Sequence, residues 1–168
     1  MKFAVDVQYD EDTAVVAGVL FQGWDDSDSV RVLTKKVDDI ESYEPGAFYK
    51  RELPCILALL EEVSEALDVI VIDGFVKLGA AETDGLGMHL YRALGEKVPV
   101  IGVAKKPFSG TPQSYEIVRG DSAKPLLVSS VGISLEESKN AILRMHGQHR
   151  IPTLLKRADQ VCRGITVN

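Results

Sequence analysis

Val69-Ile70-Val71-Ile72-Asp73-Gly74 places four consecutive β-branched residues directly before an acid and a glycine. An uninterrupted apolar run of this length is typical of a strand covered on both faces, as in a parallel sheet. Residues 98–104 form a second run of this kind and are followed by Lys105. Residues 85–94, between the two runs, have a helical pattern with Asp84 as the expected N-cap. The two runs therefore predict a β-α-β unit within an α/β fold.

The N-terminal part of the chain predicts a different kind of pairing. Residues 2–8 alternate between apolar and polar side chains, and residues 14–21 and 29–37 read as strands that follow short polar turns. Three strands connected in this way predict an antiparallel meander. From Glu52 to Leu67 the apolar residues recur at helical spacing, opposite a row of glutamates, so a helix is expected there.

The C-terminal part completes the predicted architecture. Residues 115–118 and 125–129 predict two further strands, and Ser134-Leu135-Glu136-Glu137 has the pattern of a capping box that opens a helix. A last helix is expected to end near Cys162. Together these elements predict an α/β fold in one domain, residues 1–168. Its mixed sheet combines the three-stranded antiparallel meander with parallel strands and is flanked by helices.

Charge is distributed unevenly along the chain. The net charge is −6 over 168 residues, but residues 1–91 hold 19 of the 25 acidic and only 7 of the 19 basic residues. An acidic front and a basic back can bring metal-binding carboxylates next to a phosphate-binding flank. Acidic residues in turns are also typical of an ordinary solvated surface, so the asymmetry alone leaves both interpretations open.

Hydropathy and cysteine content indicate the compartment in which the chain works. No apolar run approaches the length of a membrane span, and Met1-Lys2 lead directly into the first expected strand. Cys55 and Cys162 lack metal-ligand spacing and are interpreted as reduced structural thiols. These features predict a cytoplasmic protein without a membrane partner.

Residues 43–54, Tyr-Glu-Pro-Gly-Ala-Phe-Tyr-Lys-Arg-Glu-Leu-Pro, predict a rigid loop that leads into a helix. The pair Pro45-Gly46 favours a tight turn with aromatic residues on both sides. Glu52 arrives where the helix begins, and Pro54 suits a first helical turn because its missing N–H would be unpaired there. The loop is therefore expected to deliver one carboxylate to a fixed place.

Three carboxylates are candidates for chemistry. Asp6 interrupts an otherwise apolar strand, where a lone carboxylate is costly unless it meets a cation. Asp73 lies at the C-terminal end of a buried strand, where ligands bind in open α/β sheets. Taken singly, each acid has an alternative role: Asp6 on a strand face that is open to water, Asp73 as a turn cap, and Glu52 as a partner of the helix dipole. If the first and fourth strands are neighbours, however, the three acids meet, and oxygen-only ligands favour Mg²⁺ or Mn²⁺.

Lys105 follows the next parallel strand, so its ammonium group is expected to face the same edge of the sheet. There it would hold a phosphate as a point charge. The alternative is a surface lysine that covers apolar atoms with its aliphatic stem.

Four segments resemble endonuclease V and occur in the order of that family. They are Val5-Asp6-Val7-Gln8-Tyr9; Tyr43-Glu44-Pro45-Gly46 with Arg51-Glu52-Leu53-Pro54; Val71-Ile72-Asp73-Gly74; and Ile101-Gly102-Val103-Ala104-Lys105. The ending, Arg150-Ile151-Pro152 through Arg157-Ala158-Asp159, is similar to the last helix of the family. The combination of Tyr-x-Pro-Gly with Arg-Glu-x-Pro is specific. The chain is thus identified as a short, divergent member.

The resemblance implies a ribonuclease H-like fold and metal-dependent cleavage of DNA or RNA near inosine, one nucleotide beyond the deaminated base. By position, Asp6, Glu52 and Asp73 would be the catalytic carboxylates that bind Mg²⁺ or Mn²⁺. Lys105 would be the catalytic lysine that contacts phosphate. The implied partner is single-stranded or distorted nucleic acid.

Further residues are expected to contact that nucleic acid. Tyr43, Pro45 and Gly46 would form a wedge that separates the strands, because a rigid turn with an aromatic ring can hold unstacked bases apart. Gly74 lies in a matched motif, Arg150 begins the matched ending, and His89 resembles a histidine of the family, where packing within a helix is the alternative role.

Two departures from the family pattern bear on activity. Where the family has Gly-x-x-His-Pro-Arg after its Asp-Gly, this chain has residues 75–80, Phe-Val-Lys-Leu-Gly-Ala. The family also has a Gly-His-Arg segment, and the resemblance implies that its histidine supports the metal site. The corresponding residues 129–133 of this chain contain no histidine. The sequence therefore predicts an endonuclease but leaves open a nucleic-acid-binding homologue that does not cut, and a hydrolase of another phosphoester. It leaves DNA or RNA preference and oligomeric state open as well.

Overall fold

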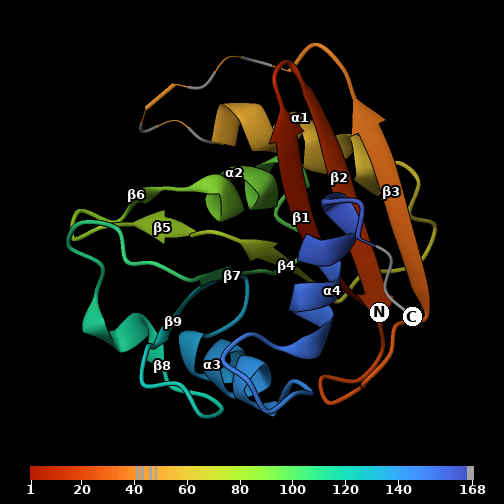
Figure 1. Cartoon of the computed structure of the whole chain (residues 1–168). Helices are drawn as coiled ribbons and strands as arrows, with labels where there is room; N and C mark the ends of the chain where they lie inside the picture. Colours follow the sequence, from red (N-terminus) through yellow and green to blue (C-terminus); the bar gives the residue numbers. More distant parts are fainter. Residues whose placement is uncertain (41, 43, 46, 48, 166–168) are drawn as a thin grey trace.

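The computed structural model describes residues 1–40, 42, 44, 45, 47 and 49–165 of the chain. Figure 1 shows a central sheet with helices on both faces. The elements in chain order are β1 (Lys2–Asp10), β2 (Thr13–Phe21), β3 (Arg31–Val37), α1 (Tyr49–Leu60), β4 (Val69–Asp73), β5 (Lys77–Leu78), β6 (Thr83–Asp84), α2 (Leu86–Ala93), β7 (Val100–Ala104), the 3₁₀ turn η1 (Gln113–Tyr115), β8 (Glu116–Ile117), β9 (Leu126–Val131), α3 (Leu135–Arg144) and α4 (Thr153–Cys162).

The main sheet has the strand order β3-β2-β1-β4-β7-β9-β8. Strands β1, β2 and β3 pair antiparallel, β4 lies parallel between β1 and β7, and β9 and β8 add two antiparallel pairings at the other edge. The predicted mixed sheet, with a three-stranded meander beside parallel strands, is therefore confirmed. Its centre is the neighbouring pair β1 and β4, on which the predicted meeting of Asp6 and Asp73 depends.

Side chains of the central strands alternate between two apolar layers because successive residues of a strand point to opposite faces. Val5 and Ile72 face the layer that α1 and α2 cover, whereas Ala4 and Val71 face the layer under α3 and α4. Both layers are thoroughly buried, which explains why the central strands read as nearly continuous apolar runs. Among the described residues, no helix combines the length and apolar character that a membrane crossing requires.

Helix α1 differs from its expected range at both ends. It begins at Tyr49, so Pro54 lies inside the helix rather than in its first turn. It ends at Leu60 instead of Leu67. The two glutamates after Leu60 place negative charge at the negative end of the helix dipole, which disfavours another turn.

The segment after β4 also differs from expectation. Asp84 does not cap α2, because the N-cap is Gly85 and no side chain bonds to it. Asp84 lies instead in the short β5–β6 hairpin, where it pairs with Lys77 at 2.6 Å and with Arg92. The predicted cap at Ser134 is confirmed, since its hydroxyl accepts a hydrogen bond from the Glu137 backbone N–H at 3.1 Å.

Candidate active site

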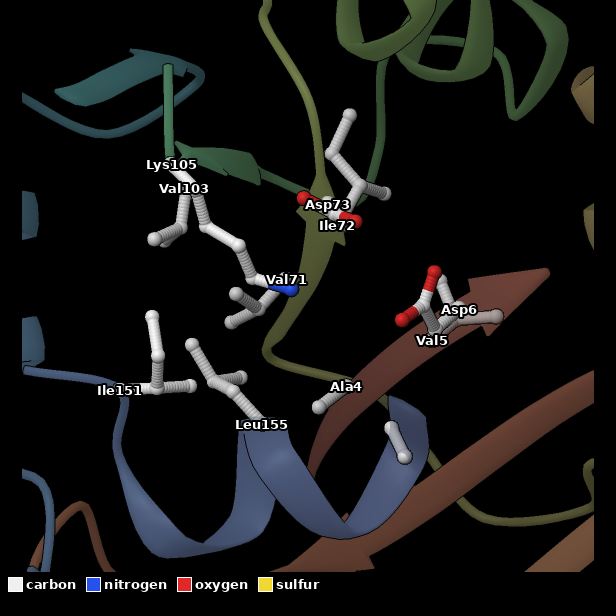
Figure 2. Close-up of a pocket in the computed structure, with 11 residues that line it drawn as sticks. Ala4, Val5, Asp6, Val71, Ile72, Asp73, Val103, Lys105, Ile151 and Leu155 are labelled. Atoms are coloured by element: carbon white, nitrogen blue, oxygen red, sulfur yellow. The ribbon is translucent and has the colours of Figure 1, made fainter. Parts of the chain in front are cut away.

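Asp6 and Asp73 project from neighbouring strands toward the same face of the sheet. Val5 pairs with Ile72 in parallel register, so the residue that follows each of them is an aspartate. Both aspartates line a pocket whose wall includes Leu155 of α4. Figure 2 shows the two carboxylates turned toward one another across the gap between the strands. The predicted meeting of these two acids therefore takes place.

Glu52 reaches the same place from the opposite layer of the molecule. Helix α1 packs on β1, its buried Ile56 belongs to the same apolar cluster as Val5, and Glu52 lies in the first turn of the helix. Glu52 and Asp73 line a common second pocket. Asp73 thus borders two pockets, one shared with Asp6 and one shared with Glu52.

Desolvation and neighbouring charges perturb the pKa values of the three acids. Desolvation, followed by the charge of Asp73, raises the pKa of Asp6 to about 7. Desolvation and the charges of Asp73 and Asp6 raise the pKa of Glu52 to about 8. The side chain of Asp73 is open to solvent on one side, but the surrounding chain still raises its pKa through desolvation. Within the described ranges, no Lys, Arg or His nitrogen lies within 4.0 Å of any of the three carboxylates.

Lys105 directly follows the last residue of β7 and points at this cluster. Val103 pairs with Asp73, and Lys105 lies two residues farther on, so it shares the face of Val103 and Asp73. Figure 2 shows its amine directed into the space beside the carboxylates. Its charge lowers the pKa of Asp73 against the effect of desolvation. Lys105 therefore contributes a positive charge to the pocket, as expected.

Asp159 is a fourth acid that the sequence did not single out. It lies on α4, and its charge raises the pKa values of Asp6 and Asp73, although more weakly than desolvation does. Asp159 also accepts a hydrogen bond from Arg163 at 2.9 Å through Oδ1. An acid four residues before an arginine reads as an ordinary helix-surface ion pair. Its place in the motif similar to the family's last helix was the only signal that could have marked it.

The second pocket has apolar and aromatic walls next to Glu52 and Asp73. Its other lining residues are Tyr49, Gly74, Phe75, Leu78, Gly85, Leu86 and Phe108. His89 of α2 lies behind this wall and stacks on Tyr49, with ring centroids 3.7 Å apart and an interplanar angle of 17°. Burial lowers the pKa of His89. Gly74 and His89 thus both lie at or next to a pocket that adjoins the carboxylates.

Arg150 is held within the protein. Its guanidinium donates to the backbone carbonyl of Lys105 and, at 2.8 Å, to that of Pro125. The buried Arg119 supports the same segment and donates to four backbone carbonyls between residues 145 and 150. Arg150 therefore ties the end of β7, which carries Lys105, to the segment that precedes α4. Its predicted contact with nucleic acid stays a prediction.

The predicted wedge lies mostly outside the described residues. Tyr43 and Gly46 are among the positions that the structure leaves undescribed, and Pro45 is exposed to solvent. The role of these three residues remains a prediction.

The two segments that depart from the family pattern meet in the structure. The backbone N–H of Val76 donates to the Ser129 hydroxyl at 2.9 Å, and Ser129 is only 1% exposed. Gly102 leaves room for this contact, because a Cβ there would lie 2.5 Å from the Gly74 carbonyl and 2.9 Å from the Ser129 oxygen. The Ser129 hydroxyl, in the segment that lacks the family's histidine, thus holds the backbone just after Asp73-Gly74.

Comparisons with known proteins identify the family of the chain. The family profile of endonuclease V matches residues 2–160. The chain belongs to the endonuclease V family. Endonuclease V from Pyrococcus abyssi is 34% identical over 166 residues, which cover 96% of this chain and 78% of that protein. Endonuclease V from Streptomyces coelicolor is 32% identical over 183 residues, which cover 95% and 76%.

Solved structures of the family have the same fold. The crystal structure of endonuclease V from Streptomyces avermitilis has a TM-score of 0.73 and 31% identity, and the match covers 96% of this chain and 79% of that one. Endonuclease V of Ciona intestinalis, solved with a DNA that contains an inosine followed by a ribo-adenosine, has a TM-score of 0.76 at 20% identity and covers 97% and 84%. The predicted ribonuclease H-like fold and family membership are therefore confirmed.

Proposed function

We propose that this protein is a Mg²⁺- or Mn²⁺-dependent endonuclease that hydrolyses a phosphodiester bond near inosine in single-stranded or distorted DNA or RNA. The observation that carries the proposal is the convergence of Asp6, Glu52 and Asp73 from three elements, with no cationic nitrogen of the described residues within 4.0 Å of their carboxylates. Family membership supports nuclease activity, and the Ciona relative was solved with inosine-containing DNA.

The donor set of this cluster fits a hard divalent cation. Asp6, Glu52 and Asp73 offer only carboxylate oxygens, which Mg²⁺ and Mn²⁺ prefer over the sulfur and nitrogen ligands typical of Zn²⁺. Desolvation outweighs the charges of Lys105 and Arg51 and raises the pKa of Asp6 and of Glu52, so a bound cation would favour their charged forms. The three residues would hold the ion between β1, α1 and β4. The chemistry supplied by bound Mg²⁺ is a lowered pKa of a water nucleophile and stabilisation of the charge that develops on phosphate.

The remaining residues would orient the nucleic acid. Lys105 directs an ammonium group into the pocket that Asp6 and Asp73 line, where it would hold a phosphate oxygen. The adjoining pocket has aromatic walls at Tyr49, Phe75 and Phe108 and is suited to a base turned out of the stack. A base in that pocket would leave its backbone next to Asp73, which borders both pockets. The lesion and the reacting phosphate would thus occupy adjoining spaces.

An oligonucleotide assay tests the proposal. A single strand with one inosine is incubated with the protein and Mg²⁺ or Mn²⁺, beside a strand with guanosine at that position. We expect cleavage near inosine by the unmodified protein and none by Asp6→Ala. If both proteins bind the strand but leave it intact, the chain is a binding homologue. If neither cuts it but the unmodified protein hydrolyses a simple phosphoester, the substrate assignment is wrong.

A further inference from the structure

A thiol lies beside two of the carboxylates on the α4 side of the site. One carboxylate oxygen from each of Asp6 and Asp159 and the Sγ of Cys162 all lie within 4.8 Å of one another. Asp159 and Cys162 are three residues apart on α4, so both side chains lie on the same face of the helix. That helix packs on β1, which carries Asp6. Two elements distant in sequence therefore bring three potential metal ligands together.

The spacing of these atoms suits one small cation after modest side-chain rotation. Zinc binds thiolate sulfur at about 2.3 Å and carboxylate oxygen at about 2.0–2.2 Å, so ligand atoms up to about 4.5 Å apart can share an ion. Arg163 engages Oδ1 of Asp159, and no hydrogen bond to Oδ2 occurs within the described part of the chain. Cys162 is only 2% exposed, whereas both aspartates are partly accessible, so an ion would enter from the carboxylate side.

The kind of ligand determines the kind of ion. A thiolate is a soft ligand that favours Zn²⁺ and its heavier analogue Cd²⁺, whereas Mg²⁺ prefers oxygen. The thiol of Cys162 now donates to the backbone carbonyl of Asp159 at 3.1 Å. On metal binding the S–H bond breaks, a sulfur–metal bond forms, and the proton passes to the buffer.

We propose that Asp6, Asp159 and Cys162 form a binding site for a thiophilic divalent cation, Zn²⁺ or Cd²⁺, whose occupation withdraws Asp6 from the Mg²⁺ site. Binding of the thiophilic ion follows from the three ligands alone. Its inhibitory effect on cleavage rests on the proposed function. Zinc bound at this site would weaken Mg²⁺ binding and thereby inhibit Mg²⁺-supported cleavage.

Cys55 provides a matched control. It is buried on α1 and, like Cys162, donates its thiol to a backbone carbonyl on its own helix, that of Arg51 at 3.5 Å. It is not among the three clustered ligands. A Cys55→Ser variant therefore removes a buried thiol without touching the proposed site.

Cadmium titration tests the binding directly, in metal-free protein and without nucleic acid. We expect a saturable sulfur-to-cadmium charge-transfer band in the ultraviolet, at one ion per chain, in the unmodified protein and in Cys55→Ser. The band should be lost in Cys162→Ser and in Cys162→Ala, and weakened at least about tenfold in affinity in Asp159→Asn. Circular dichroism confirms that each variant is folded. Absence of the band from the unmodified protein, or its persistence in both folded Cys162 variants, overturns the proposal.

Competition then separates this inference from the proposed nuclease activity. Excess Mg²⁺ should weaken cadmium binding in the unmodified protein, and Zn²⁺ should inhibit Mg²⁺-supported cleavage less in Cys162→Ser. Cadmium binding that Mg²⁺ does not weaken refutes the shared use of Asp6. A protein that shows the cadmium band but cleaves no oligonucleotide supports the ion site and refutes the nuclease.

Discussion

Asp6 and Asp73 each follow one member of a paired couple, Val5 and Ile72, on neighbouring parallel strands. This register turns both acids to the same face of the sheet. A shift of one residue in either strand would move one carboxylate into the opposite apolar layer. The candidate site is therefore a consequence of the register between β1 and β4.

Removing either aspartate should abolish most of the cleavage. We expect Asp6→Asn and Asp73→Asn each to lower the rate about 100-fold or more, because metal ions contribute several kcal/mol to the stabilisation of developing charge. Single-turnover cleavage of an inosine-containing strand measures the effect. Asp12→Asn, in the exposed turn between β1 and β2, is the control and should cleave at the normal rate. A normal rate in both active-site variants would remove these acids from the mechanism.

The stability of the metal-free protein should depend on pH in a defined direction. The pKa values of Asp6 and Glu52 rise to about 7 and about 8 in the folded chain, from 3.8 and 4.5. Between these limits the folded state binds more protons than the unfolded state, so the free energy of unfolding falls as pH rises. Thermal melts in a chelator, from about pH 5 to about pH 9, should show this fall and show it reduced in Asp6→Asn.

Magnesium should reverse that loss. A cation that binds only the folded, deprotonated site stabilises it by mass action, and most strongly at alkaline pH. The rise in Tm on adding Mg²⁺ should therefore be larger near about pH 9 than near about pH 5. An equal rise at both ends, or an equal rise in Asp6→Asn, would show that the ion acts elsewhere.

Lys105 and Lys106 are adjacent but should behave differently. Lys105 lines the pocket with Asp6 and Asp73, whereas Lys106 is exposed outside it. We expect Lys105→Ala to slow cleavage by about tenfold or more and to reduce the slope of log affinity against log salt by about one phosphate contact. Lys106→Ala should leave the single-turnover rate unchanged. Equal cleavage rates in the two variants would show that Lys105 does not contact the reacting phosphate.

Arg150 has two possible roles that salt dependence distinguishes. Its hydrogen bonds to the carbonyls of Lys105 and Pro125 predict that Arg150→Met destabilises the fold by about 1.5–3 kcal/mol. If the guanidinium only holds these carbonyls, the salt slope of nucleic-acid binding stays unchanged. If Arg150 also contacts phosphate, the slope falls by about one contact. Arg144→Met, at the exposed end of α3, is the control for stability.

The central strands were predictable because a strand that is buried on both faces has an almost uninterrupted apolar sequence. The run from Val69 to Ile72 predicts a buried strand, and Asp73 was therefore expected at the carboxyl end of that strand. Glu52 was found through its motif. Its approach to Asp73 depends on how α1 packs across the strands, which no local pattern encodes.

The features that the sequence missed depend on contacts between distant residues. Asp84 is a residue type that often caps helices, but its carboxylate forms ion pairs with Lys77 and Arg92 instead. In the sequence, Asp159 looks like a surface acid that pairs with Arg163. Only the packing of α4 on β1 brings it close to Asp6. The hairpin of β5 and β6 has only two residues in each strand, too few for a periodic signal.

Mn²⁺ binding, followed by electron paramagnetic resonance of the free ion, tests the proposed metal centre most directly. Metal-free protein should deplete the free Mn²⁺ signal saturably, without nucleic acid present. Asp6→Asn and Asp73→Asn should weaken this binding by at least about tenfold, and Asp12→Asn should bind normally. Mg²⁺ should compete for the same site. If the unmodified protein leaves the Mn²⁺ signal unchanged, or if both variants bind Mn²⁺ as tightly as it does, the three carboxylates are not a metal centre.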